Sequence, residues 1–341
     1  MYGTGKTWLR AAATESKVAL PFAVVLALLL WRLTNNPDIL AITTLIVCAL
    51  TAVLWIAIDK KYALIRVRSQ SISTLYAFLA ATLLFPRITW LDAAAALCLC
   101  AAYYFLFGAY QQPRAVGHVF HAFLCLSLGS LFFTPLIFFA PCLIFYVAHH
   151  ARALSWRTWW AAVVGLVTPY WFKAALIAYN GGFAWVADAC RQIGDLPPSL
   201  RFDFHAIVAC IPHPLSAFGL QPIDYNVLLH ANWTALAALG LMVLFTVIAA
   251  VHCYRTSFND KIRTRIFLYI LIWQNYFILA FLLLQPTALI PLFAVMVMNS
   301  APLLAHHYAL GRGRAVDVAF LILFLSCLTL YVYGLFRNLY D

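Results

Sequence analysis

The run ILAITTLIVCALTAVLWIAI, residues 39–58, decides the fold because it carries no charged side chain from end to end. An α-helix rises about 1.5 Å per residue, so this run is long enough to cross the roughly 30 Å hydrocarbon core of a bilayer. The rest of the chain is similar, since 65% of its 341 residues are hydrophobic and 10% are charged. A soluble domain has about 25% charged residues. We therefore predict an all-α, polytopic transmembrane helix bundle.

Apolar runs of this kind recur along the whole sequence, and we expect about eleven spans in one integral-membrane domain, residues 1–341. The region 115–150 allows two interpretations: two short spans joined at Thr134, or a re-entrant pair. The expected spans are 18–33, 39–58, 71–86, 90–110, 115–133, 135–150, 158–178, 227–252, 265–284, 288–307 and 316–336.

The basic residues predict the orientation of these spans. With a cytoplasmic N-terminus and alternating sides, 16 of the 22 lysines and arginines fall inside, but only four of the 11 acidic residues do. Excess Lys and Arg in cytoplasmic loops is the pattern of known inner-membrane proteins. The net charge of +11 therefore reflects the topology of the spans. It indicates lipid headgroups, and not nucleic acid, as the partners of the basic residues. We predict that the protein lies in a bacterial inner membrane. Tryptophans near span ends, Trp55 among them, are expected to anchor the spans at the interfaces.

One long polar interval, residues 179–226, interrupts the apolar pattern and is predicted to be a structured loop on the outer face. Phe183–Ile193 has apolar and charged residues on separate faces, which suits a short helix on the membrane surface. Two cysteines, Cys190 and Cys210, lie in this interval and would be free to form a disulfide in an oxidising compartment. The other seven cysteines lie in apolar runs and are expected to pack as small hydrophobic residues.

The acidic and basic residues of the outer face form the candidate site. An aspartate there would accept a proton from an acceptor hydroxyl, while cations would hold a phosphate leaving group. The alternative is that these residues are ordinary solvated loop charges. The catalytic candidates are Asp38, Asp188, Asp203 and His205, and the phosphate-binding candidates are Arg87, Lys173, Arg191 and Arg201.

The histidines allow further interpretations. His118 and His121 share a face of the fifth span, where they would bind a metal or relay protons, or else form hydrogen bonds within the bundle or lie at its inner edge. The pairs His149-His150 and His306-His307 end spans on the cytoplasmic side and are expected to be interfacial caps. The standard nucleotide-binding and metalloprotease motifs are missing from the sequence, which leaves any cofactor unknown.

Three short segments resemble a family of uncharacterised, multi-pass bacterial inner-membrane proteins. They are LGSLFFTP at 128–135, SWR at 155–157 and GLVTPY at 165–170. The resemblance covers about residues 120–172 and otherwise concerns the layout of the spans. It implies a multi-pass inner-membrane protein without an established activity.

The layout and the stretch Gly129–Pro135 are also similar to those of integral-membrane glycosyltransferases that use polyprenyl-phosphate sugars. That resemblance implies a catalytic acid in the first outer loop, where Asp38 stands in this chain, although the loop is short and lacks the paired acids of that class. Three functions follow as hypotheses: an enzyme handling a lipid-linked sugar or polyprenyl phosphate at the outer face, a lipid or solute transporter, or a non-catalytic scaffold that binds another membrane protein.

Overall fold

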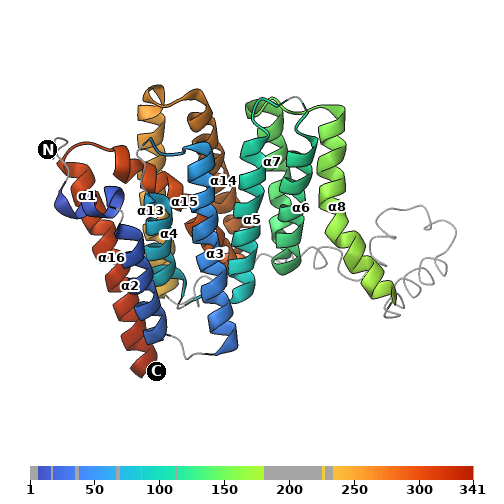
Figure 1. Ribbon diagram of the computed structural model, residues 1–341. Coiled ribbons are helices and arrows are strands. Elements are labelled where there is room, and N and C mark those ends of the chain that lie inside the picture. Colours follow the sequence, from blue (N-terminus) through green and yellow to red (C-terminus); the bar gives the residue numbers. More distant parts are fainter. Residues whose placement is uncertain are drawn as a thin grey trace.

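The computed structural model describes residues 7–16, 18–34, 38–66, 70–85, 87–112, 114–179, 225–226 and 233–340, and the regular elements in these ranges are helices (Figure 1). The prediction of an all-α fold is confirmed. Each of the apolar runs predicted from the sequence lies on helical backbone over most of its described length.

The first half of the bundle begins with a short helix, which antiparallel helices follow. One of these is divided into the consecutive segments η2, α7 and η3. In chain order the helices are α1 (Trp8–Glu15), α2 (Ala19–Thr34), α3 (Ile39–Tyr62), α4 (Ser71–Leu79) continued by the π-helix η1 (Ala80–Leu84), α5 (Trp90–Gly108), α6 (Val116–Phe132), the 3₁₀-helix η2 (Thr134–Phe139), α7 (Ala140–Phe145), the π-helix η3 (Tyr146–His150) and α8 (Trp156–Tyr179).

The second half is made of long helices. They are α13 (Trp233–Thr256) with the 3₁₀ turn η4 (Ser257–Asn259), α14 (Ile262–Leu284), η5 (Pro286–Ala288), α15 (Leu289–Leu310) and α16 (Arg314–Tyr340). Successive long helices run in opposite directions, so the two chain termini lie at opposite ends of the bundle (Figure 1).

The bundle has two ends, the α1 end and the far end. The "α1 end" holds α1 and the connections that follow α3, α13 and α15, which are joined by contacts such as Arg10 to Gly311 and Arg66 to Asp260. The "far end" holds the start of α3 and the start of α13. There the hydroxyl of Tyr331 donates to the carbonyl of Leu30 over 2.6 Å, which joins α16 to α2.

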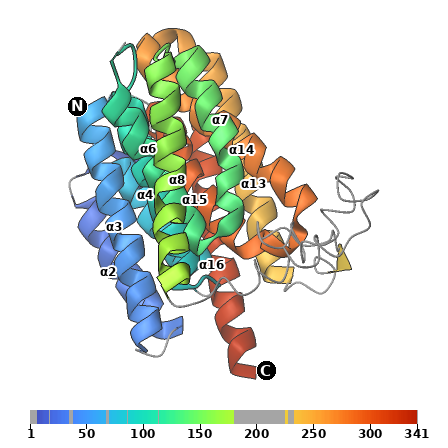
Figure 2. The same cartoon turned by 90° about the vertical axis from the view of Figure 1, so that its right-hand side faces the viewer.

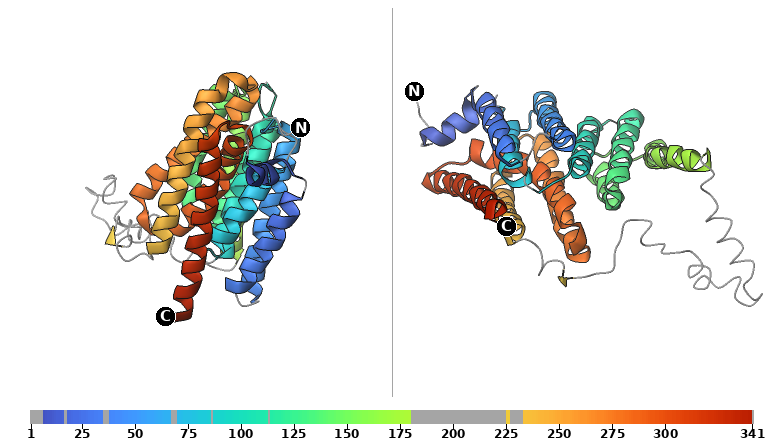
Figure 3. Two further views of the ribbon diagram at one scale, coloured as in Figure 1. Left: turned by 90° about the vertical axis from the view of Figure 1, so that its left-hand side faces the viewer. Right: turned by 90° about the horizontal axis from the view of Figure 1, so that it is seen from below.

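Helix α15 is the centre of the fold. In its apolar window 89% of the residues are buried, against 22% in the windows of α3 and α16. It contacts α4, α5, α13 and α14, whereas α8 lies at the edge of the bundle furthest from α16 (Figure 3). Viewed from that edge, α8 runs in front of α6 (Figure 2), which it contacts closely.

Six helices in the described residues are long and apolar enough to cross a membrane, and they indicate a membrane protein. They are Ile39–Tyr62, Trp90–Gly108, Trp233–Asn259, Ile262–Leu284, Pro286–Leu310 and Arg314–Phe336, and shorter apolar helices lie at Ala19–Thr34, Ser71–Leu84, Val116–Phe132 and Thr134–His150.

The region 115–150 forms two antiparallel legs that meet at Thr134, the junction predicted from the sequence. Phe133 leaves the helix in an extended conformation, and Pro135 then occupies the first turn of η2, where a proline needs no amide hydrogen.

The prediction that Trp55 anchors α3 at an interface is wrong, because its side chain is 0% exposed. Trp156 and Trp171 are exposed, as expected of anchors. A tryptophan in an apolar run suits a core as well as an interface, and only the packing of α3 against its neighbours decides between them.

Several residues of the family resemblance lie where α6 packs closely against its neighbours. A Cβ atom on Gly165 of α8 would lie 2.6 Å from the carbonyl oxygen of Phe120 on α6, and one on Gly129 of α6 would lie 2.6 Å from Leu136 of η2. The hydroxyls of Ser130 and Tyr170 are 2.7 Å apart and link α6 to α8. These motifs therefore serve close helix packing, which small residues permit in membranes.

Candidate functional site

Asp38 lies at the far end, in the extended N-cap position of α3, and its carboxylate accepts a hydrogen bond of 2.8 Å from the backbone nitrogen of Ile39. It lines a recess of about 440 Å³, here called the Asp38 recess, together with Trp31, Trp90 and Thr89. The carboxylate is exposed and so remains accessible to a ligand in the recess.

Arg87 and Lys173 are not brought to Asp38. The guanidinium of Arg87 donates to the carbonyl of Leu83 over 2.8 Å and reaches the carbonyl of Thr234 at 3.5 Å, so it faces α13. Burial lowers the pKa of Arg87. Lys173 is exposed on α8, and none of the ion pairs in the described part of the chain joins it to Asp38. The far end thus does not assemble a phosphate clamp from these two cations.

The remaining predicted site residues lie outside the described residues, as do both cysteines of the predicted disulfide and the predicted surface helix. They are Asp188, Asp203, His205, Arg191, Arg201, Cys190 and Cys210.

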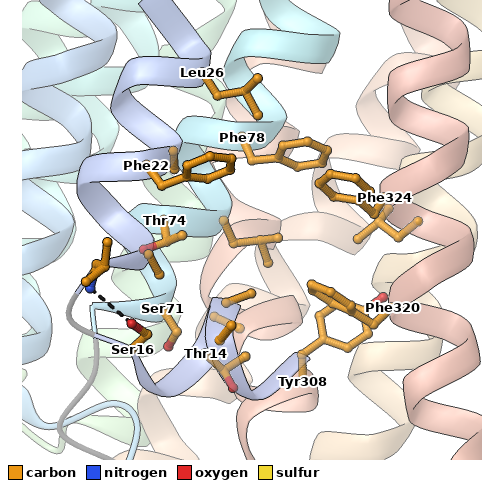
Figure 4. A pocket seen from close by; sticks show the side chains of 18 of the residues that line it. Thr14, Ser16, Phe22, Leu26, Ser71, Thr74, Phe78, Tyr308, Phe320 and Phe324 are labelled. Carbon is orange, nitrogen blue, oxygen red and sulfur yellow. Dashed lines mark hydrogen bonds between the residues drawn. The ribbon is translucent and has the colours of Figure 1, made fainter. Parts of the chain in front are cut away.

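A hollow of about 370 Å³ lies near the α1 end and is here called the lateral cavity. Its volume falls within the range of roughly 300–1,000 Å³ typical of small-molecule sites. Helix α1 covers it with Ala12 and Ala13, α2 and α16 form its sides, and α4 and α15 form its floor. Most of the lining is hydrocarbon, with Thr14, Ser16 and Ser71 near one side (Figure 4).

The lateral cavity opens sideways between α2 and α16. Phe22 of α2 lines it and is 66% exposed, so this wall reaches the surface of the bundle. On the other side Phe324 of α16 stacks on Phe78 of α4, with ring centroids 4.8 Å apart (Figure 4). Because the flanking helix surfaces are apolar, an aliphatic chain in the surrounding lipid would enter here without being exposed to water.

A second and larger hollow, here called the polar recess, lies at the α1 end and measures about 890 Å³. Both charge signs are present in its lining. The charged lining residues are Glu15, Asp59, Lys60, Arg66 and Lys261, and the uncharged polar ones are Ser16, Gln70, Ser73 and Thr264.

The lateral cavity and the polar recess adjoin. Ser16 lines both, and the first turn of α4 supplies Ser71 to the cavity and Ser73 to the recess. A molecule occupying both would therefore have an apolar chain and a polar head. Membrane lipids have this structure.

Helix α1 is held in place by a buried ion pair. The side chain of Arg10 is 0% exposed, and its Nη1 lies 3.0 Å from Oδ1 of Asp317 on α16. Nη2 of Arg10 also donates to the carbonyl of Gly311 over 3.0 Å. Burial lowers the pKa of Arg10, and the carboxylate of Asp317 opposes that shift. This pair positions α1 over the lateral cavity.

A chain of polar contacts closes the α1 end beside the polar recess. Asp260 pairs with Arg66 at 3.2 Å, and its other oxygen lies 3.0 Å from Nε2 of His306. Because the carboxylate accepts, Nε2 of His306 is the donor, and in the neutral imidazole Nδ1 then accepts from the thiol of Cys253 at 3.5 Å. Burial by itself would raise the pKa of Asp260, but the hydrogen bond and the charge of its partners lower it overall.

These contacts correct the prediction that His306 and His307 are interfacial caps. His306 is 0% exposed and His307 is 5% exposed, so both lie inside the bundle. By contrast, His149 at the end of η3 is exposed. The sequence gives both pairs the same position at the end of an apolar run, and only the central place of α15 buries one of them.

Neutral polar side chains gather midway along α15. Tyr103 donates to Asn299 over 2.9 Å, and the amide of Asn299 donates to the carbonyl of Leu271 over 2.7 Å. Ser300 receives a hydrogen bond from Thr246 over 2.9 Å. These three hydrogen bonds involve no Asp, Glu, Lys or Arg side chain. The network joins α5, α13, α14 and α15, and holds these helices in register.

His118 and His121 do not form a metal site in the described part of the chain, where no group of three His, Cys, Asp or Glu side chains is arranged to hold an ion. His118 packs near Gly108, and His121 lies against the rings of Phe105 and Phe120. Their observed contacts are therefore those of packing residues.

Sequence reasoning missed the residues of the α1 end. Arg10, Asp260 and Asp317 look like ordinary loop charges in the sequence. One signal was present: Asp260 and Asp317 are acids in connections that are otherwise strongly basic. An acid in such a place suggests a specific partner. Comparison with protein-family models, with curated proteins and with solved structures gives no match for this chain.

Proposed function

We propose that this chain is an integral protein of a bacterial inner membrane, with eleven spans and a cytoplasmic N-terminus, that binds a lipid bearing a phosphate head. The observation that carries the proposal is the lateral cavity adjoining the polar recess at Ser16. In this arrangement the lipid chain enters between α2 and α16, and the head lies among the charged side chains of the recess.

The orientation proposed for the bundle is supported by the charges. The α1 end contains Lys60, Arg66 and Lys261, which the positive-inside pattern assigns to the cytoplasm. With that orientation the polar recess lies at the level of the inner-leaflet headgroups. The lateral cavity then lies beside their acyl chains, which is the arrangement a bound lipid requires.

Filling the lateral cavity tests the proposal. Ala13→Trp places an indole in the cavity, and we expect it to displace at least two methylene groups of a bound chain. At about 0.8 kcal/mol for each methylene, lipid affinity falls roughly tenfold. The measurement is native mass spectrometry of the purified protein after exposure to phospholipid or to polyprenyl phosphate, which distinguishes the two sources of a phosphate head.

The matched control is Ala49→Trp, because Ala49 is exposed on α3 and does not line the cavity. The control is expected to retain lipid as the unchanged protein does. Equal retention by the Ala13 and Ala49 variants, or no retained lipid in any sample, would contradict the proposal.

A second candidate function is sugar transfer from a polyprenyl-phosphate donor at the far end, and the position of Asp38 in its own recess favours it. Asp38→Asn tests it sharply, since asparagine caps a helix as well as aspartate does. We expect an unchanged unfolding temperature together with a loss of sugar transfer of about 100-fold or more, the usual contribution of a general base. The measurement is transfer by purified protein in lipid vesicles, and full activity of the variant would remove Asp38 from the reaction.

A further inference from the structure

We infer that the polar recess selects a zwitterionic phospholipid whose head carries a primary amine next to its phosphate. The inference rests on the lipid binding proposed above and names the class of headgroup. It arises from the two charge signs in the recess lining and from where the recess meets the lateral cavity.

The cations of the recess do not form an uncompensated anion site. Arg66 is paired with Asp260 at 3.2 Å, so part of its charge is already neutralised. Lys60 and Lys261 are exposed and remain able to approach a phosphate. A phosphate between them would receive charge-assisted hydrogen bonds.

The recess also contains carboxylates. Glu15 and Asp59 line the same recess as the two lysines. A lipid with a purely anionic head would bring its charge toward both carboxylates, which repel it. A head that carries an ammonium group next to its phosphate has both charge signs, as the lining of the recess does.

Glu15 lies where the polar recess meets the lateral cavity. Glu15 ends α1 and is followed by Ser16, the residue shared with the lateral cavity. Asp59 is in the last turn of α3, where its carboxylate accepts from the backbone nitrogen of Ile65 at 3.3 Å. A head entering past Ser16 therefore reaches polar groups from α1, α3 and α4 before it meets bulk water.

The geometry also distinguishes a primary amine from a quaternary one. A quaternary ammonium has the same charge but no N–H, so it cannot donate to a carboxylate. The described lining of the recess comprises carboxylates, cations, hydroxyls, an amide and aliphatic side chains, and no tryptophan, tyrosine or phenylalanine is among these described residues. Quaternary ammonium groups are recognised by aromatic cages. The lining thus favours the primary amine.

The experiment is a competition between lipids of the same acyl chains. Purified full-length protein is exposed to phosphatidylethanolamine, phosphatidylcholine or phosphatidylglycerol, and in a fourth arm to polyprenyl phosphate. Native mass spectrometry measures the retained lipid. We expect phosphatidylethanolamine to be retained about tenfold more tightly than the other three, the effect of roughly one charge-assisted hydrogen bond.

Carboxylate variants give the second measurement. The double change Glu15→Gln and Asp59→Asn is expected to abolish the preference for phosphatidylethanolamine over phosphatidylcholine while total lipid retention persists. The matched control is Asp92→Asn, a change at an aspartate in the first turn of α5 that does not line the recess, and it is expected to keep the preference. The preference of the unchanged protein needs no variant, so it tests the inference even if the double variant fails to fold.

The outcomes separate this inference from the proposed function. Tighter binding of phosphatidylglycerol or polyprenyl phosphate, or a preference that survives the double change, would overturn the headgroup inference and leave lipid binding intact. Loss of all retained lipid from the unchanged protein would overturn both. Sensitivity to Ala13→Trp without any headgroup preference would support the lateral cavity alone.

Discussion

Replacing Arg10 by glutamine is expected to lower the free energy of unfolding by about 3–5 kcal/mol, because it leaves the Asp317 carboxylate buried without its partner. Asp317 is 8% exposed, and Arg10 is the cation with which it pairs, at 3.0 Å. The change also removes the hydrogen bond from Arg10 to the carbonyl of Gly311. Denaturant titration of the purified protein in mild detergent measures the loss.

Two further variants make this result specific. Arg312→Gln removes an exposed arginine from the same end of the bundle and is expected to change stability by less than about 1 kcal/mol. The double change Arg10→Gln with Asp317→Asn removes both charges and is expected to recover much of the loss. Equal stability of the Arg10 and Arg312 variants would show that the ion pair does not hold α1.

The second large effect is expected at Gly165. Gly165→Ala places a Cβ atom 2.6 Å from the carbonyl oxygen of Phe120 and 3.1 Å from the backbone nitrogen of Leu124. Because both contacts are backbone atoms of α6, no side chain can rotate away, and α6 and α8 must move apart. Overpacking of this kind costs about 1–3 kcal/mol.

Gly240→Ala is the matched control for Gly165→Ala. Gly240 is also within a long helix, but a Cβ atom there would meet nothing within 4 Å. The same chemical change should therefore stabilise α13 by roughly 0.5–1 kcal/mol, the difference in helix propensity between glycine and alanine. The two variants are expected to shift the unfolding midpoint in opposite directions. Parallel shifts would contradict the close approach of α6 and α8.

The contacts of α1 link stability to the proposed function. Ala12 and Ala13 of this helix cover the lateral cavity, and Arg10 on the same helix fixes it to the turn between α15 and α16. A variant that releases α1 is expected to lose lipid as well as stability. The polar recess lies beside the same helix end, since Glu15 and Ser16 line it.

The segments that carry the family resemblance have a structural role in the bundle. Ser130, Gly165 and Tyr170 lie at the contact between α6 and α8, whereas Gly129 lies against Leu136 of η2 and Cys98 of α5. None of these four residues lines the lateral cavity or the polar recess. Short apolar motifs identify positions where helices approach closely, because membrane helices associate through small residues and interhelical hydrogen bonds. They do not identify where a ligand binds.

The sequence by itself determined the helical class and the places of the long helices, because a bilayer leaves a backbone with few ways to satisfy its hydrogen bonds. It also indicated the junction at Thr134, since the proline that follows suits the first turn of a new helix. Which charges are buried was decided only by the tertiary structure. Arg10 and Asp317 are 307 positions apart, and they meet because α1 folds back onto the start of α16.

The lateral cavity and the burial of His306 have the same origin. Each depends on which helix faces lie together, and hydropathy along one chain does not specify the neighbours of a helix that is apolar on all sides. Helix α15 became central through its contacts with α4, α5, α13 and α14, and this placed His306 beside Asp260. The apolar composition of the sequence indicates that lipid surrounds the helices, whereas the candidate site arises from the packing of the helices against one another.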